Sequence, residues 1–263
     1  MKNLDFKKLL VLLLIIAAAV AVVFLIFKVV SKDSLNDEEK KKIEEKVSSY
    51  YTNLTDGYTT VYGGTDMLFQ KESTTFADLE TASVIYTAIK YAENNEIDTS
   101  VKTMYLDSIK AEGKYGDLSE YSAYSGTGVR EAIKALFGEV NYTDTSSTDN
   151  HNFKYDYVYI SKYDLYLMKK SNALEIENSK QHVEKHVIKT EEKEDKIVTT
   201  VAIAYVYDDG TTIKYASDKN GENIIVEDVK EFPTDFIDKF DKFEITLTKK
   251  DNNYIFESIK KVK

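Results

Sequence analysis

Two histidines and a glutamate occupy alternate positions of one short segment and could bind a metal ion. His182, Glu184 and His186 supply imidazole and carboxylate groups, which are common zinc ligands. On a helix the two histidines would share one face, but a zinc protease needs its acid directly after the first histidine, where Val183 stands. The local pattern favours a strand, with the three side chains on one solvated face. We therefore predict no cofactor and keep these three residues as the candidates for a metal site.

Tyrosine is unusually frequent, with 20 Tyr beside 12 Phe and no Trp. Tyr155, Tyr157 and Tyr159 alternate with other residues, so a strand would place them on one face. A row of tyrosines can stack on sugar rings or contact a protein, because each ring combines apolar area with a hydroxyl group. Tyrosine also fits any half-buried strand. Both interpretations, a binding surface and a packed face, stay open.

A second acidic segment has part of the spacing of a calcium-binding loop. Asp218, Asn220, Gly221 and Glu227 match the third, fifth, sixth and twelfth positions of such a loop, but Ala216 replaces its first aspartate. The sequence Asp-Lys-Asn-Gly is also an ordinary turn, because Asn and Gly tolerate a left-handed backbone. The turn is the favoured interpretation.

Two further patterns have incomplete catalytic or binding spacing. The segment Gly126-Thr127-Gly128 could present backbone N–H groups to an anion, but it lacks the third glycine and the lysine of a phosphate loop. We predict that it begins a helix. Ser258 and Lys261 have the spacing of a serine–lysine pair on a helix, yet their segment reads as a strand, which would place them on opposite faces.

The composition excludes several kinds of chemistry. The chain contains no Cys, which removes disulfides, thiolate zinc sites and cysteine nucleophiles. Arg130 is the only arginine, so no arginine cluster can grip a phosphate. A pair of carboxylates can hydrolyse a glycosidic bond without any local motif, so a carboxylate-dependent hydrolase stays open.

The secondary structure that would position these residues changes from helices to strands along the chain. Apolar residues at helical spacing predict three helices, over 79–92 with Asp78 as a cap, over 101–109, and over 129–137. From Phe153 onward the period changes to two, and hairpins are predicted from 182–190 with 197–207 and from 243–248 with 254–259. This order indicates an α+β fold, in which a helical part (76–140) packs on a C-terminal antiparallel β-sheet (153–263).

An uninterrupted apolar segment lies near the N-terminus. Leu9–Phe27 has no charged or polar side chain, and its 19 residues at about 1.5 Å each span roughly 28 Å, close to the hydrocarbon thickness of a bilayer. We predict a single transmembrane helix that anchors the chain in the lipid bilayer. A signal peptide cleaved after Ala19-Val20-Ala21 is the alternative.

The charges on the two sides of this segment bear on its orientation. The first 32 residues carry +4 and the whole chain −10, which leaves −14 for residues 33–263. Basic residues favour a short cytoplasmic N-terminus (1–8), and a long following domain is translocated largely regardless of its charge. We therefore predict a cell-membrane protein with an extracytoplasmic body. A body this acidic also argues against a nucleic-acid partner.

The remainder divides into a charged juxtamembrane stalk helix (28–54), which we expect to dock near Tyr50, and an extracytoplasmic α+β domain (55–263). The lack of a coherent catalytic pattern predicts a non-enzymatic module that binds a protein partner of the cell envelope or takes part in assembling an envelope machine. Glycan binding by the tyrosine-rich face and a carboxylate-dependent envelope hydrolase are the alternatives.

Overall fold

The computed structural model describes residues 37–54, 67–147, 155–173, 181–208, 210–251 and 253–262. The predicted anchor, Leu9–Phe27, lies outside these residues. Within the described part of the chain, no helix is both long enough and apolar enough to cross a membrane. The chain divides into two units, one ending at Glu44 and the other running from Glu45 to the C-terminus.

Helix α2 (Asp37–Ser48) begins in the first unit with three acidic residues, Asp37, Glu38 and Glu39. Carboxylates in the first turn are stabilised by the positive end of the helix dipole. Lys42 Nζ lies 2.7 Å from a Glu38 carboxylate oxygen one turn earlier, the spacing at which helical ion pairs form. Local charge therefore favours a helix at this place.

The second unit is an α+β fold in which helices pack against antiparallel β-sheet, as the sequence predicted. Its helical elements are η1 (Ser49–Leu54), η2 (Met67–Gln70), η3 (Phe76–Asp78), α3 (Thr81–Asn94), α4 (Thr103–Glu112), η4 (Leu118–Glu120), α5 (Gly126–Phe137), η6 (Ser161–Tyr163) and η7 (Thr234–Lys239). Its strands are β1 (Ser73–Thr75), β2 (Tyr121–Ser125), β3 (Tyr155–Ile160), β4 (Leu165–Ala173), β5 (Gln181–Lys193), β6 (Lys196–Asp208), β7 (Ile213–Ala216), β8 (Ile224–Glu227), β9 (Asp241–Lys250) and β10 (Asn253–Val262).

The larger sheet has the strand order β1-β10-β9-β6-β7-β8, with β5 also paired to β6. Strand β6 is central, because β5 pairs with it along its length while β9 and then β7 pair with its other edge. Its residues from Ile197 to Val206 are buried on both faces. A strand covered on both faces needs no alternation of polar residues, which explains the nearly continuous apolar and threonine run.

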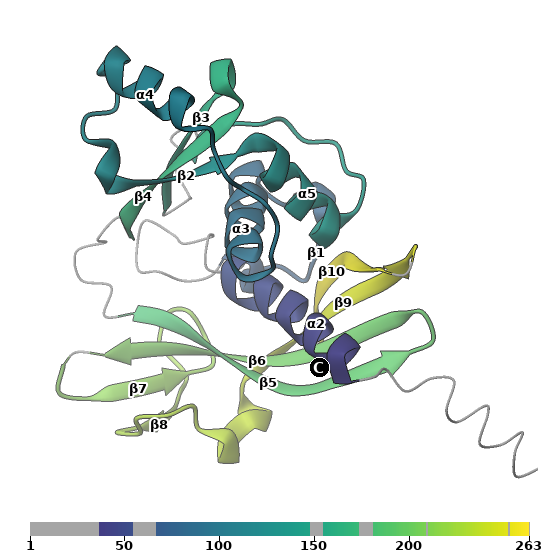
Figure 1. The fold of residues 1–263 in the computed structure, drawn as a ribbon. Coiled ribbons are helices and arrows are strands. Elements are labelled where there is room, and N and C mark those ends of the chain that lie inside the picture. Colours follow the sequence, from purple (N-terminus) through teal and green to yellow (C-terminus); the bar gives the residue numbers. More distant parts are fainter. Residues whose placement is uncertain are drawn as a thin grey trace, which may run out of the picture. The chain divides into compact units, whose positions relative to one another are not determined.

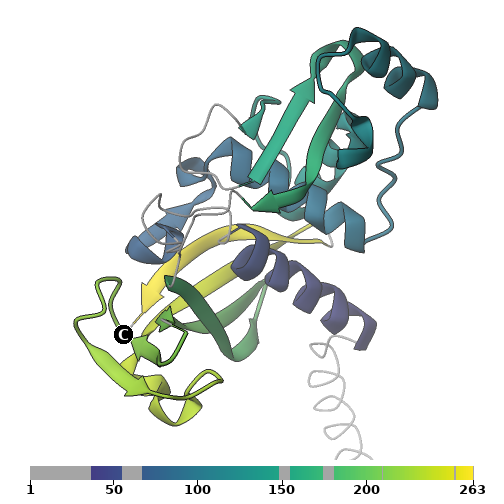
Figure 2. The same ribbon diagram turned by 90° about the vertical axis from the view of Figure 1, so that its left-hand side faces the viewer.

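A smaller sheet, ordered β2-β4-β3, forms a second layer of strands that the sequence did not predict as a separate sheet. It shares a small core with α4, made by Ile109, Ile160, Leu165 and Leu167. Figure 1 and Figure 2 both show α4 at one end of this unit and the β7–β8 hairpin at the other. Strand β2 lies within the stretch expected to be helical.

Helices α3 and α5 pack against each other, and α5 also contacts β2 and β10.

The prediction that Asp78 caps α3 is wrong. The Asp78 carboxylate accepts hydrogen bonds from Thr75 N and Thr75 Oγ1, both at 2.8 Å, and so closes the short turn η3. Helix α3 starts after Glu80, which makes no side-chain capping hydrogen bond.

The last turn of α5 is held by residues that lie far apart in the sequence. Lys46 Nζ donates to the carbonyl oxygens of Ala135 and Tyr254, each at 3.1 Å, and to Asn253 Oδ1. Tyr50 is fully buried, and its hydroxyl donates to Leu136 O at 2.5 Å. Helix ends leave carbonyls without intrahelical partners, and these donors satisfy them. The stretch from Lys46 to Leu54, expected in the stalk, thus lies in the core of the second unit.

Candidate functional site

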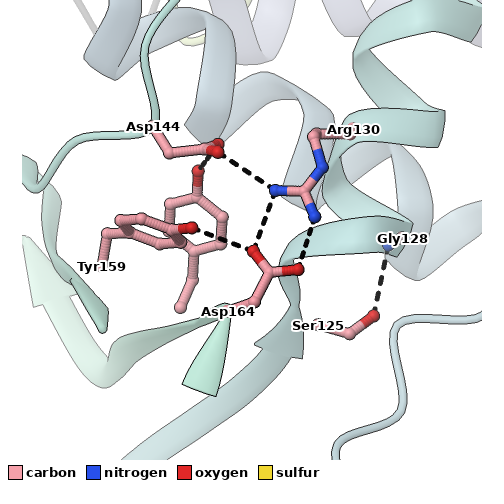
Figure 3. Close-up of polar contacts among 7 residues, drawn as sticks. Ser125, Gly128, Arg130, Asp144, Tyr159 and Asp164 are labelled. Atoms are coloured by element: carbon pink, nitrogen blue, oxygen red, sulfur yellow. Dashed lines mark hydrogen bonds and ion pairs between the residues drawn. The ribbon is translucent and has the colours of Figure 1, made fainter. Parts of the chain in front are cut away.

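One cluster of charged side chains gathers around the single arginine. Arg130, on α5, donates from Nη1 to Asp144 Oδ2 at 3.0 Å and to Asp164 Oδ1 at 2.9 Å, and from Nη2 to Asp164 Oδ2 (Figure 3). Asp144 lies in the segment after α5, and Asp164 in the turn between η6 and β4. One planar guanidinium therefore bridges two carboxylates from separate parts of the chain.

Tyrosine hydroxyls complete this cluster. Tyr159 Oη donates to Asp164 Oδ1 at 2.9 Å, and the Tyr166 hydroxyl donates to Asp144 Oδ1 (Figure 3). The hydroxyl of Tyr142 is buried and has no hydrogen-bond partner among the described residues. Burial, with the nearby Asp144 charge, raises the pKa of Tyr142 to about 12. We call Arg130, Asp144, Tyr159, Asp164 and Tyr166 the Arg130 cluster.

The start of α5 is shaped to admit Asp164. Ser125 Oγ accepts from Gly128 N at 3.2 Å, so Ser125 caps the helix, and Gly126 N donates to Asp164 O at 2.8 Å. A Cβ on Gly126 would overlap the Asp164 carboxylate, and one on Gly128 would overlap the Asp98 carbonyl. Gly126-Thr127-Gly128 is therefore a helix start, as predicted. The missing side chains of the two glycines let Asp164 and the Asp98 carbonyl lie close to the helix backbone.

The contacts of the Arg130 cluster are those of an ion-pair network. The hydrogen bond from Arg130 holds the pKa of Asp164 below its usual value. Glycoside hydrolysis needs one carboxyl group that stays protonated near neutral pH, which requires a raised pKa. The lowered pKa of Asp164 is the opposite of what that role requires. The cluster fastens α5 to the β3–β4 region and to the segment that carries Asp144.

The predicted metal ligands lie on β5, and the strand interpretation of this segment is confirmed. Glu184 accepts a hydrogen bond from Tyr215 Oη at 3.0 Å, and the His186 ring stacks on Phe232 at a centroid distance of 5.1 Å. The side chain of His182 lies outside the described residues. Among the residues that are described, no group of three His, Cys, Asp or Glu side chains could hold a metal ion.

The three tyrosines of the predicted binding surface have different surroundings. Tyr157 is fully buried, and its hydroxyl donates to Ala82 O at 3.2 Å, so no ligand can reach its ring. Tyr159 is half-buried and belongs to the Arg130 cluster. Tyr155 lies on β3, but its side chain is outside the described residues.

The contacts of the Asp218 carboxylate are those of the turn that the sequence analysis favoured over a calcium loop. Its oxygens accept from the backbone N–H groups of Asn220 at 2.9 Å and Asn223 at 2.6 Å, so they cap a turn.

Ser258 and Lys261 both lie on β10, and Lys261 Nζ donates to Asp241 Oδ2 at 2.6 Å. That ammonium is therefore paired with a carboxylate, and the strand prediction for both residues is confirmed.

A surface on α4 and η6 was not singled out by the sequence. The Tyr105 and Tyr163 rings lie 5.4 Å apart between centroids, and Lys102 and Lys162 place an ammonium over them. Met104 was predicted to lie in the apolar stripe of this helix, but it is 64% exposed. We call Lys102, Met104, Tyr105, Lys162 and Tyr163 the α4 patch.

The sequence carried one signal for this surface. Met104, Tyr105 and Leu106 are consecutive in α4, and Ile109 is the only buried residue of this helix among the described residues. Consecutive helical residues point in different directions, so these three side chains cannot all face the same core. Comparison with known proteins gives no match, since no family profile, no curated protein and no solved structure is significantly similar to this chain.

Proposed function

We propose that this protein is a single-pass membrane protein, anchored through Leu9–Phe27, whose extracytoplasmic body binds a protein partner through the α4 patch without catalysing a reaction. The observation that carries this proposal is Met104, which is 64% exposed and directly precedes Tyr105, whose ring lies tilted against that of Tyr163. Methionine and tyrosine are enriched at the centres of protein interfaces. An exposed large apolar side chain in such company is typical of an interaction surface.

The construction of the α4 patch supports a binding role. Its tyrosines pack on the core formed by Ile109, Ile160, Leu165 and Leu167, so their backbone positions are fixed before a partner arrives. A rigid aromatic surface loses little conformational entropy on binding. Asp164 is paired with Arg130, so this carboxyl group gives no support to the alternative of a carboxylate-dependent hydrolase. Glycan binding through Tyr155, Tyr157 and Tyr159 is the weaker alternative, because Tyr157 is buried.

Photo-crosslinking in intact cells tests this proposal. A photoreactive amino acid replaces Met104 in the full-length chain, and in matched chains it replaces Phe236, which is 43% exposed. Phe236 lies on η7 and is an exposed apolar residue away from α4. We expect a discrete protein adduct from position 104 and none from position 236. No adduct, an equal adduct from both positions, or a polysaccharide adduct would each contradict the proposal.

A further inference from the structure

Two lysine–tyrosine pairs lie side by side in the α4 patch, and one of them already holds a carboxylate. Lys162 Nζ lies 4.8 Å from the centroid of the Tyr163 ring. Lys162 Nζ donates to Glu112 Oε1 at 2.7 Å, and Tyr163 Oη donates to the same oxygen at 3.0 Å. The ammonium and the phenol thus converge on one carboxylate oxygen, which is a charge-assisted arrangement.

The second pair, Lys102 and Tyr105, also joins a lysine to a tyrosine, but it holds no carboxylate among the described residues. Lys102 Nζ lies 5.7 Å from the centroid of the Tyr105 ring, which in turn lies tilted against the Tyr163 ring at a centroid distance of 5.4 Å. Within the part of the chain that the structure describes, neither the Lys102 ammonium nor the Tyr105 hydroxyl takes part in a hydrogen bond or ion pair. Both groups are hydrogen-bond donors, and one carries a positive charge.

We propose that Lys102 and Tyr105 bind a carboxylate of the protein partner, as Lys162 and Tyr163 bind Glu112. This inference rests on the proposed function and names its partner class, which is an acidic segment with an apolar side chain that packs on Met104. The body as a whole is acidic, and residues 33–263 carry −14. Long-range attraction therefore does not recruit an acidic partner, and recognition depends on these two donors at short range.

Methyl NMR of the full-length chain in lipid nanodiscs provides the test. Methionine methyl groups are labelled, so that Met104 reports on the patch and the buried Met168 reports on the core. The probe is a short synthetic peptide of Glu, Leu and Gly, and the control peptide has Lys in place of Glu. We expect saturable shifts of the Met104 methyl with the Glu peptide alone, while the Met168 signal stays in place.

Three variants test whether Lys102 and Tyr105 bind the Glu peptide. Lys102→Gln should weaken the peptide affinity about tenfold or more, because one charge-assisted hydrogen bond is lost. Tyr105→Phe removes only the hydroxyl and should weaken it less. Lys110→Gln removes an exposed lysine of the same helix and should leave the affinity unchanged. The inference is overturned if Met104 does not respond, if the Lys peptide binds equally well, or if Lys110→Gln costs as much as Lys102→Gln.

The photo-crosslink separates this inference from the proposed function. If position 104 captures a partner and Lys102→Gln leaves that adduct undiminished, the protein-binding function holds and the carboxylate assignment falls. If position 104 captures nothing while the Glu peptide shifts Met104 in a Lys102-dependent manner, the carboxylate pair holds and the partner proposal falls. Both experiments together therefore give different results for the two failures.

Discussion

At the scale of single residues, the Arg130 cluster shows how far local sequence information reaches. Arg130 stands out in the sequence as the only arginine, but its partners Asp144 and Asp164 are 14 and 34 residues away. No spacing rule links positions that the tertiary fold brings together. Gly126 and Gly128 were identified correctly as a helix start, because the start of a helix is set by local capping.

Replacing Arg130 should destabilise the body more than replacing a surface lysine of the same helix. Arg130→Met leaves Asp144 and Asp164 without their shared cation, and we expect a loss of about 1–3 kcal/mol in the free energy of unfolding. The Arg130 side chain is 39% exposed, so solvent screening limits the loss. The measurement is urea unfolding followed by tyrosine fluorescence, since the chain has no Trp.

Lys134→Met is the matched control for this prediction. Lys134 lies one turn after Arg130 on α5 and forms an exposed ion pair with Glu139. An exposed pair contributes at most about 0.5–1 kcal/mol. If the two variants unfold at the same urea concentration, the Arg130 cluster does not stabilise the fold as described.

Lys46 is a second residue whose setting only the structure reveals. Its side chain is 7% exposed, and burial lowers its pKa from the usual 10.5 to about 8. Between these two pH values the unfolded chain keeps a proton that the folded chain has released. The free energy of unfolding therefore rises with pH over this range.

This pH dependence should disappear when Lys46 cannot titrate. We expect wild type to gain stability relative to Lys46→Met as the pH rises from about 8 to about 10.5, measured by urea unfolding with circular dichroism at each pH. Comparison with the variant removes the contribution of tyrosine ionisation elsewhere. A falling difference over the same range would show that the three acceptors around Lys46 stabilise its charged form more than burial opposes it.

At the scale of elements, the sequence pattern predicted the strands with a clear apolar signal and missed the others. Strand β5 and the β9–β10 hairpin show a period of two, and β6 is a continuous run of apolar residues and threonines. Strands β1 and β2, with three and five residues, are too short for any period to show. Strand β4 has nine residues but no regular alternation, so the smaller sheet, in which it is central, was not predicted.

Helix α5 depends on a close approach to the backbone of residues 98–99. Gly128→Ala places a Cβ that overlaps Asp98 O and lies 3.0 Å from Thr99 Cα. Because backbone atoms cannot rotate away, we expect overpacking to cost about 1–3 kcal/mol in the free energy of unfolding. Thr127→Ala, at the exposed neighbouring position, should change stability by less than about 0.5 kcal/mol in the same urea titration. Equal stability of the two variants would contradict this packing.

At the scale of the whole molecule, membrane attachment and orientation remain predictions from the sequence. The chain has no Cys, so single cysteines can report on exposure without background labelling. We expect Lys110→Cys to react with a membrane-impermeant maleimide in intact cells, and Lys2→Cys to react only after the membrane is permeabilised. The opposite pattern would place the body in the cytoplasm. Loss of the Lys2→Cys label from the mature chain would indicate a cleaved signal peptide.

The last turn of α5 joins the beginning of this body to its end, which bears on the order in which the chain is made. Lys46 leaves the ribosome well before Asn253 and Tyr254, its partners in the same set of hydrogen bonds, which follow it by 207 and 208 residues. Strand β1 likewise cannot pair until β10 has been synthesised. A chain that stops before β10 lacks these contacts, so we expect it to be a substrate for quality-control proteases.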